Sequence, residues 1–300
     1  MRRRSPVRSF AEYCLARIVL CSLRFSPRPL ALGLARLYTA ALDLFLPRLR
    51  RIAAINLSFA LPEASLEEQQ RIIDGVWRSI ARLLVVFARF PDLRRPEKLR
   101  RWIRYEGYEH FEKALQRGRG VLFATAHFGN WEFSAFAHGV LSTPMHVLVR
   151  PLDNPRIDRL VEKRRTLSGN SVIGKKDFAR TILKALANNQ AVGVLIDQNS
   201  SLDAGVFVDF FGKPACAGTG FARLAARSGA AVIPGFALWS SEEERYVLRF
   251  FPPVDMSGDA EADTRRLQAV LESVIRLYPD QWLWIHRRWK TRPAGEPLLY

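Results

Sequence analysis

The sequence predicts an α/β protein: a layered domain with a central mixed or largely parallel sheet flanked by helices, preceded by an N-terminal helical region. Two observations support this fold class. From about residue 105 onward, short apolar runs typical of buried strands alternate with segments of helical spacing. Before that point the apolar positions follow helical spacing, and the first strand-like run is Trp102 to Gly107.

We expect three regions: residues 1–46 as membrane-associated apolar and basic helices, 47–104 as an amphipathic helical lead-in, and 105–300 as the catalytic domain. A chain of 300 residues is long enough to bury a full core.

The first 46 residues combine apolar runs with arginines. The apolar runs are Tyr13 to Leu23 and Leu30 to Leu46; the charged residues before and within them are Arg2, Arg3, Arg4, Arg8, Arg17, Arg36 and Asp43. Neither run reaches about 18 uninterrupted apolar residues, so the sequence does not predict a transmembrane helix. No small-residue cleavage site follows the first run, which argues against a removable signal peptide. Basic flanks around an interrupted apolar segment favour an interfacial or re-entrant membrane anchor. A pair of buried core helices is the alternative.

The helical lead-in and the catalytic domain are marked by caps and breaks. Ser65 and Glu68 form a capping-box pattern that predicts a helix running to about Arg89. Further strands are expected at 121–126, 145–149, 191–196, 231–238 and 246–251, and further helices at 109–117, 131–140, 154–168, 177–188, 218–228 and 260–277.

The composition is strongly basic. Lys and Arg number 46 against 29 Asp and Glu, a formal net charge of +17. Such a balance predicts an anionic membrane surface, an acidic protein or nucleic acid as partner. No zinc-finger, helix-turn-helix or RRM pattern is present, so we expect no nucleic acid. The three cysteines have neither metal-ligand spacing nor a disulfide framework, which fits a cytoplasm-facing location.

The stretch from Ala124 to Glu132 carries the residues best suited to chemistry. His127 follows a buried strand, Asn130 is placed to cap the next helix, and Glu132 lies in the first turn of that helix. Gly129 eases the turn between them. Such a corner can bring Glu132 to one imidazole nitrogen while the other acts as a base. A histidine near a turn is otherwise commonly a capping or core residue.

The segment His127-Phe-Gly-Asn-Trp-Glu132 is similar to the His-x4-Glu motif of the bacterial lipid A late acyltransferases of the lauroyl/myristoyl type. Further blocks follow in the order seen in that family: Val149–Pro155, Asp197-Gln198, Val206–Gly212 and Pro279–Pro293. The resemblance covers roughly residues 45 to 300. It implies a glycerolipid-acyltransferase-like fold and a bacterial inner-membrane protein with its chemistry on the cytoplasmic face.

The resemblance further implies transfer of a fatty acyl chain from an acyl carrier protein thioester, or less favourably from coenzyme A, to a hydroxyl of a lipid A precursor. A hydroxyl needs a general base, and His127 has a suitable pKa range. Because the thioester is already activated and no Gly-x-Ser-x-Gly serine is present, we expect direct transfer without an acyl-enzyme. No metal or organic cofactor is required. Acylation of another glycolipid or a lysophospholipid is an alternative.

Polar residues at neighbouring strand ends are predicted to contact substrate. In a parallel sheet, Arg150 and Asp197-Gln198 would lie at the same edge as His127. Asn130 and one arginine of the basic helix, for which we choose Arg164, complete this set. The alternative role for Arg150 is a salt bridge to Asp153 or Asp158.

Two further hypotheses concern other parts of the site. The aromatic segment 205–211 is a candidate lining for an acyl tunnel. A metal-dependent hydrolase using His127, Glu132 and Asp197 is an alternative from a different class, although the spacing of these residues is not that of a known zinc site. A catalytically silent, basic membrane-binding protein is a third.

Overall fold

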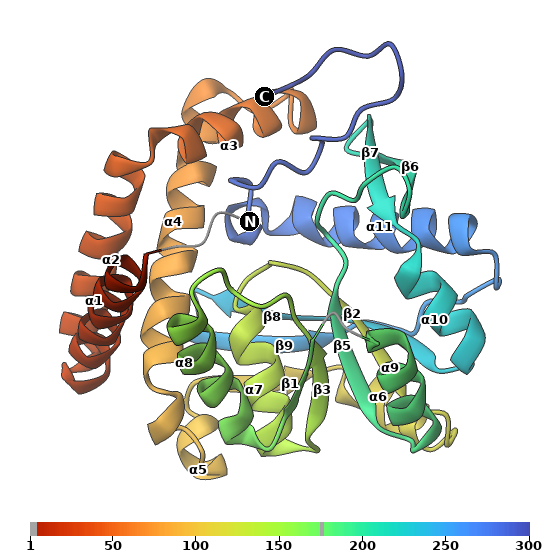
Figure 1. The fold of residues 1–300 in the computed structure, drawn as a ribbon, viewed down its shortest axis with the longest axis horizontal. Coiled ribbons are helices and arrows are strands. Elements are labelled where there is room, and N and C mark those ends of the chain that lie inside the picture. Colours follow the sequence, from red (N-terminus) through yellow and green to blue (C-terminus); the bar gives the residue numbers. More distant parts are fainter. Residues whose placement is uncertain (1–4, 175–176) are drawn as a thin grey trace.

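The computed structural model describes residues 5–174 and 177–300, and a seven-stranded sheet lies at its centre (Figure 1). The strand order is β1-β9-β8-β2-β5-β3-β4. Strands β8, β2, β5, β3 and β4 are parallel, whereas β9 is antiparallel to β8 and β1 runs with β9. The strands of this sheet are β1 Ile103–Glu106, β2 Val121–Thr125, β3 Met145–Leu148, β4 Ser171–Ile173, β5 Ala191–Leu195, β8 Ala231–Ser240 and β9 Arg245–Phe250. The predicted mixed or largely parallel sheet is confirmed. Strand β4 and a separate hairpin of β6 (Gly205–Phe210) and β7 (Lys213–Gly218) were not predicted.

Helices cover both faces of the sheet, as the alternation along β2 shows. Val121 and Phe123 pack in one core cluster with α6 and α7, and Leu122 and Ala124 pack in another with α9 and α10. The helices are α1 Pro6–Phe25, α2 Arg28–Phe45, α3 Pro47–Ala60, α4 Leu66–Ala88, α5 Pro96–Leu99, α6 Tyr108–Leu115, α7 Trp131–Leu141, α8 Pro155–Arg165, α9 Phe178–Ala187, α10 Gly220–Ser228 and α11 Ala260–Leu277.

The long helix α4 stands between the N-terminal helices and the sheet (Figure 1). Its predicted cap is confirmed, since Ser65 Oγ accepts a hydrogen bond from Glu68 N at 3.1 Å. Its residues share a core cluster with α1, α2 and the sheet. The helical lead-in therefore packs into the same core as the sheet, and residues 104 and 105, between which the boundary is expected, both lie in β1.

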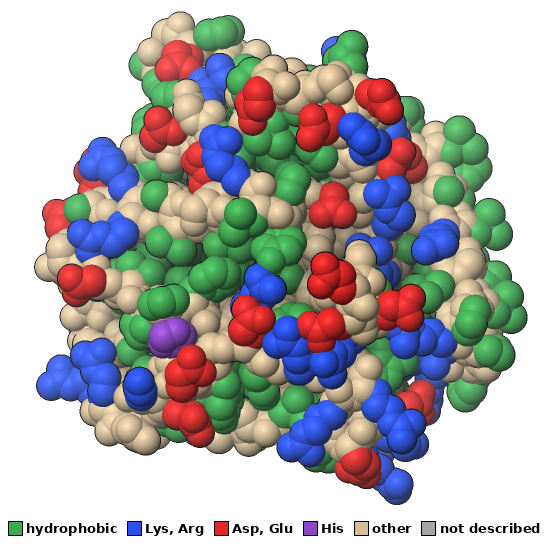
Figure 2. Space-filling model, turned by 180° about the vertical axis from the view of Figure 1, so that it is seen from behind, with side chains coloured by type: hydrophobic (Ala, Val, Ile, Leu, Met, Phe, Trp, Pro, Cys, Tyr) green, Lys and Arg blue, Asp and Glu red, His purple; other side chains and the backbone are tan. Residues whose placement is uncertain are grey.

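The N-terminal hairpin of α1 and α2 is buried on one side only. Leu23 and Ala31 are fully buried against α4, as the alternative of core helices requires. Apolar side chains gather along the right edge of Figure 2, on the side of the molecule where this hairpin lies. The large apolar residues that the hairpin and the following turn expose are Val7, Phe10, Leu15, Ile18, Phe25, Leu30, Leu37, Leu42, Leu44, Phe45 and Leu46. In the described chain, no helix by itself has the length and apolarity to cross a membrane; α2 and α3 meet that criterion together but are bent by 85°. Arg2, Arg3 and Arg4 of the predicted basic flank lie outside the described residues.

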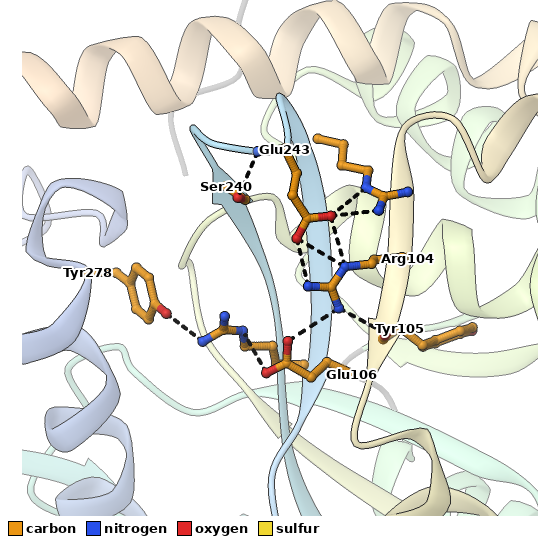
Figure 3. A network of polar contacts seen from close by, with 8 residues as sticks. Arg104, Tyr105, Glu106, Ser240, Glu243 and Tyr278 are labelled. Carbon is orange, nitrogen blue, oxygen red and sulfur yellow. Dashed lines mark hydrogen bonds and ion pairs between the residues drawn. The ribbon is translucent and has the colours of Figure 1, made fainter.

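Charged side chains reinforce the reversed strands β1 and β9 (Figure 3). Glu243, in the turn between β8 and β9, accepts a hydrogen bond from Arg104 of β1 at 2.7 Å and another from Arg245 at 2.8 Å. These two bonds lower the pKa of Glu243 to about 2. Glu106 pairs with Arg104 and Arg249 at 3.3 and 3.2 Å. Arg104, Arg245 and Arg249 are therefore each paired with a carboxylate.

Candidate active site

Parallel strands bring the predicted polar residues to one edge of the sheet. Thr125 at the end of β2 is in register with Leu195 at the end of β5. His127 and Asp197 each lie two residues further along, so the two side chains meet. Arg150 follows β3, which lies on the other side of β5.

Asp197 holds the imidazole of His127. Its Oδ1 lies 3.0 Å from His127 Nδ1, and its Oδ2 accepts hydrogen bonds from the His127 backbone N–H and the Trp282 indole N–H, both at 3.0 Å. Burial opposes ionisation of Asp197, but the charge of His127 and these hydrogen bonds outweigh it and keep the pKa of Asp197 below its usual value. The pair is therefore an ionised acid against an imidazole.

The same interaction acts on the pKa of His127. Burial lowers it, but the charge and hydrogen bond of Asp197 outweigh that effect, so the pKa of His127 lies above its usual value. The ring borders a cavity, and its Nε2 lies 3.5 Å from Gln198 Nε2. One imidazole nitrogen is thus fixed by the core, and the other is available to a bound molecule.

Glu132 has a different partner from the predicted one. Arg165 binds it through two hydrogen bonds, from Nε to Oε2 at 2.8 Å and from Nη2 to Oε1 at 2.5 Å. Burial disfavours the charge on Arg165, but this bidentate pair outweighs it and holds its pKa above the usual value. Both side chains line the cavity beside His127. The prediction that Glu132 orients the imidazole is therefore wrong, because Asp197 occupies Nδ1.

The arginine that lines the cavity is Arg165, whereas the residue chosen from the sequence is Arg164. Adjacent residues of a helix point about 100° apart, so only one of the two can face the cavity. The guanidinium of Arg164 lies 5.8 Å from the ring of Phe87 on α4 and does not line the cavity.

Helix α8 is attached to α1 at its other end. The side-chain oxygen of Asn154 accepts the backbone N–H of Arg156 at 3.0 Å and caps the helix. Its amide nitrogen donates to Ser9 O and to Glu12 Oε2 of α1, both at 2.9 Å. Asn154 is buried, and it connects α1 to the helix that carries Arg165.

Two other predicted residues take different places. Asn130 caps α7 as expected, accepting the Phe133 N–H at 3.0 Å, but it is fully buried and does not line the cavity. Its predicted contact with substrate stays a prediction. Arg150 lines the cavity with a side chain 72% exposed, and its Nη2 lies 4.0 Å from Asp153 Oδ1.

The cavity has a volume of about 740 Å³ and lies between α7 and one face of the sheet. Its lining includes residues of β2, β3, β5 and β8 together with the rim segment 148–153. The segment 205–211 does not contribute. Phe210 and Phe211 instead pack against Trp282 in a separate core cluster, so the acyl-tunnel interpretation of this segment was wrong.

A sequence profile described as "Bacterial lipid A biosynthesis acyltransferase" matches residues 2–291. The chain belongs to this family. It is 31% identical over 262 residues to "Lipid A biosynthesis lauroyltransferase" of Escherichia coli (strain K12), covering 85% of this chain and 84% of the relative. It is 32% identical to the palmitoleoyltransferase of the same organism over 263 residues, covering 85% and 83%. The corresponding myristoyltransferase is 26% identical over 253 residues, covering 84% and 78%. The chain is thus an acyltransferase of lipid A biosynthesis.

The C-terminal segment of this lipid A acyltransferase holds the histidine loop. Leu283 N donates to His127 O at 3.1 Å, and Gly129 N donates to Gln281 O at 2.9 Å. Trp282, Trp284 and Trp289 are almost completely buried, so they form core and not a membrane-interface belt. Sequence reasoning missed the contact of Trp282 with Asp197, since no local spacing relates residues 85 positions apart.

The three side chains proposed as metal ligands, His127, Glu132 and Asp197, do not point to a common position. Glu132 is bound by Arg165, whereas Asp197 faces His127 and Trp282. Within residues 5–174 and 177–300, no three His, Cys, Asp or Glu side chains are placed to hold a metal ion. The geometry does not favour the metal-dependent hydrolase alternative.

Proposed function

We propose that this acyltransferase moves a fatty acyl chain from an acyl carrier protein thioester to a hydroxyl of a lipid A precursor by direct transfer with His127 as general base. The supporting observation is the contact of the imidazole with Asp197. Nδ1 lies 3.0 Å from Asp197 Oδ1 and the ring borders the cavity, so the neutral ring that carries its proton on Nδ1 presents an unprotonated Nε2 as the base. A base in this position can take a proton from a hydroxyl brought to the cavity mouth.

The proposed reaction needs one base and no covalent enzyme intermediate. The acceptor oxygen attacks the thioester carbon as its proton passes to Nε2, and Asp197 stabilises the resulting imidazolium. Collapse of the tetrahedral intermediate breaks the C–S bond. The departing thiolate takes the proton back from Nε2, so the products are an ester and a free thiol.

Arg165 supplies positive charge where the oxyanion forms. Its guanidinium has five N–H donors, of which Glu132 uses two. The remaining donors and the charge can stabilise the developing oxyanion. Glu132 then acts by positioning Arg165. Because Arg150 and Gln198 line the cavity, we assign them contacts with the donor or the phosphorylated acceptor.

We place the enzyme on the cytoplasmic face of the bacterial inner membrane. The exposed apolar side chains of α1 and α2 suit an interfacial anchor, and the net charge of +17 suits anionic lipid. The same charge suits an acidic carrier protein as donor. The relatives are named for lauroyl, palmitoleoyl and myristoyl transfer in lipid A biosynthesis, which supports a fatty acyl donor.

The test uses the full-length protein in neutral detergent with acyl carrier protein thioesters and a lipid A precursor, with products identified by mass spectrometry. Wild type should form an acylated precursor, and His127→Ala should lower kcat by roughly 10²–10⁴-fold. His146→Ala is the matched control, because His146 bonds Gln190 at 3.1 Å and does not line the cavity. Full activity of His127→Ala would overturn the proposed base. Faster acylation of a lysophospholipid or another glycolipid would replace the acceptor.

A further inference from the structure

We infer that Gly193 and Met145 form the closed end of the cavity and set the length of the acyl chain that this enzyme accepts. The inference rests on the proposed acyl transfer, which places the thioester carbon at His127 and the methyl end of the chain deep in the cavity.

The cavity follows the strands away from His127. Its mouth lies at the edge where β2 and β5 end, with Gln198, Arg150 and Glu132 in its lining. Its lining also includes Met145, the first residue of β3, which is paired with Ala191 at the start of β5. Because these strands are parallel, Met145 lies at the opposite edge of the sheet from His127.

Gly193 creates the space on the sheet side. It lies in register with Phe123 of β2 and with Val147 of β3, and all three line the cavity. Residues of β5 that face the cavity are two positions apart, so Gly193 is the next cavity-facing residue after Leu195 in the direction away from His127. Because Gly193 has no side chain, a channel remains between β5 and α7 at this position.

Met145 closes that channel. A Cβ added to Gly193 would lie 2.7 Å from Met145 Cε, so the tip of the thioether covers the glycine. The backbone of Met145 is held by Asn170, whose side-chain oxygen accepts the Met145 N–H at 3.0 Å. The side chain is buried and has flexible torsions, so it fills the end of the cavity without sealing it rigidly.

The wall beside this end is apolar and uncharged. His138 lines it, with Nδ1 3.1 Å from the hydroxyl of Tyr105 and its ring 5.3 Å from that of Phe123. Burial lowers the pKa of His138 to about 3, so the imidazole is neutral at physiological pH. An uncharged wall of this kind fits the methyl end of an alkyl chain and not a polar head.

The depth of the cavity predicts a chain length. His127 and Phe123 are four residues apart, which corresponds to about 13 Å at roughly 3.3 Å per strand residue. An extended alkyl chain advances by about 1.25 Å per carbon, given a C–C bond of roughly 1.5 Å and near-tetrahedral angles. The end formed by Gly193 and Met145 therefore fits a saturated chain of about ten to twelve carbons.

The experiment measures kcat/KM for carrier-protein thioesters from C8 to C18 with the full-length enzyme. For wild type, kcat/KM should rise about fourfold per added carbon while each methylene enters apolar space. It should then fall at least tenfold at the first carbon that does not fit. Gly193→Ala should move this limit about two carbons shorter, and Met145→Ala, which removes three side-chain atoms, about two carbons longer.

A double variant shows whether Gly193→Ala acts by filling the cavity or by disturbing the fold. Met145→Ala removes the atom that the new Cβ would meet, so Gly193→Ala/Met145→Ala should regain a limit at or above that of wild type. Val192→Ala is the matched control: it lies next in the chain and is fully buried, but it packs on the opposite face of the sheet. Its chain-length limit should equal that of wild type. An unchanged limit in Gly193→Ala, or an equal shift in Val192→Ala, would overturn the inference.

A binding measurement distinguishes failure of this inference from failure of the proposed function. Dissociation constants for free fatty acids from C8 to C18, obtained by calorimetry in detergent, report the depth of the cavity without any chemistry. If Gly193→Ala and Met145→Ala change the longest fatty acid that binds, but wild type transfers no acyl chain, the proposed acyl transfer is wrong and the assignment of the closed end is right. If transfer occurs but neither profile responds to Gly193→Ala or Met145→Ala, the closed end is wrong.

Discussion

Two carboxylates flank His127, and the protein holds them in opposite ways. Asp197 follows a central strand, is only 3% exposed, and is bonded by His127 and by Trp282 of the C-terminal segment. Glu132 lies in the first turn of α7 and is bonded by Arg165, whose own helix is attached to α1 through Asn154. The imidazole is thus oriented by the core, whereas the positive charge beside it is positioned by peripheral helices. Different parts of the molecule therefore orient the base and position the positive charge.

The largest effect is expected on the Asp197 side. Asp197→Asn keeps the shape but removes the charge and favours the wrong imidazole tautomer, so kcat should fall roughly 10³–10⁴-fold, as for the orienting acid of a hydrolase triad. Rapid-quench measurement of a single turnover would report this loss directly.

The same substitution should also move the pH dependence of kcat in a defined direction. The neutral imidazole is the active form, and the raised pKa of His127 places the acid limb of wild type above the ordinary histidine value of about 6.5. Asp197→Asn removes the two largest interactions that raise this pKa, whereas the effect of burial, which lowers it, remains, so the acid limb of the residual activity should move to lower pH. A limb that moves to higher pH would contradict the assignment of Asp197.

A double-mutant cycle tests whether the two carboxylates act separately. Glu132→Gln and Arg165→Gln should each lower kcat by roughly 10²-fold, the usual effect of losing an oxyanion donor. Their combination should be little worse than either, because they form one ion pair. Glu132→Gln combined with Asp197→Asn should instead multiply the two losses. Strong non-additivity in this second pair would mean that Glu132 does support the imidazole.

A smaller effect is expected at Trp282. Trp282→Phe removes one hydrogen bond to a buried carboxylate, so kcat should fall by roughly tenfold or less. Trp284→Phe is the matched control, because this equally buried indole donates to Pro279 O at 2.7 Å instead. Both variants should lose similar thermal stability in a detergent melt. Equal kcat values for the two variants would remove Trp282 from the positioning of Asp197.

The smallest effect is expected from exposed charge on α8. Arg159→Glu with Lys163→Glu reverses two exposed residues, which should lower kcat/KM for the carrier-protein donor severalfold at low salt and reduce its salt dependence. Acyl coenzyme A, a smaller body with fewer charges, should be affected less. The control reverses Arg223 and Arg227, exposed at the same spacing on α10. Equal changes for both donors would assign the α8 charge to the membrane or the acceptor.

Much of the fold could be predicted because apolar periodicity is a local signal. The strands that end before His127, Arg150 and Asp197 were located within about a residue of their observed bounds. Strand β4 was not predicted because it has only three residues. The β6–β7 hairpin was not predicted because its aromatic residues suggested a ligand tunnel.

The pairing within the site could be predicted only in part. That His127, Glu132 and Asp197 would gather at one sheet edge followed from the strand ends. Which carboxylate meets the imidazole depends on the register of β2 against β5, which no local pattern encodes. Likewise, the choice between Arg164 and Arg165 depends on the rotation of α8 against α4, because the basic run offers either residue equally.

The attachment of α8 to α1 bears on how the enzyme should be prepared. Cutting away the first helix, a common step toward a well-behaved soluble fragment, would remove the Ser9 carbonyl and the Glu12 carboxylate that bind the amide of Asn154. Such a fragment would keep its sheet and its imidazole but carry Arg165 on a helix without its anchor. Inhibitors selected against it would be fitted to an incomplete pocket, so screening belongs with the intact chain in detergent or lipid.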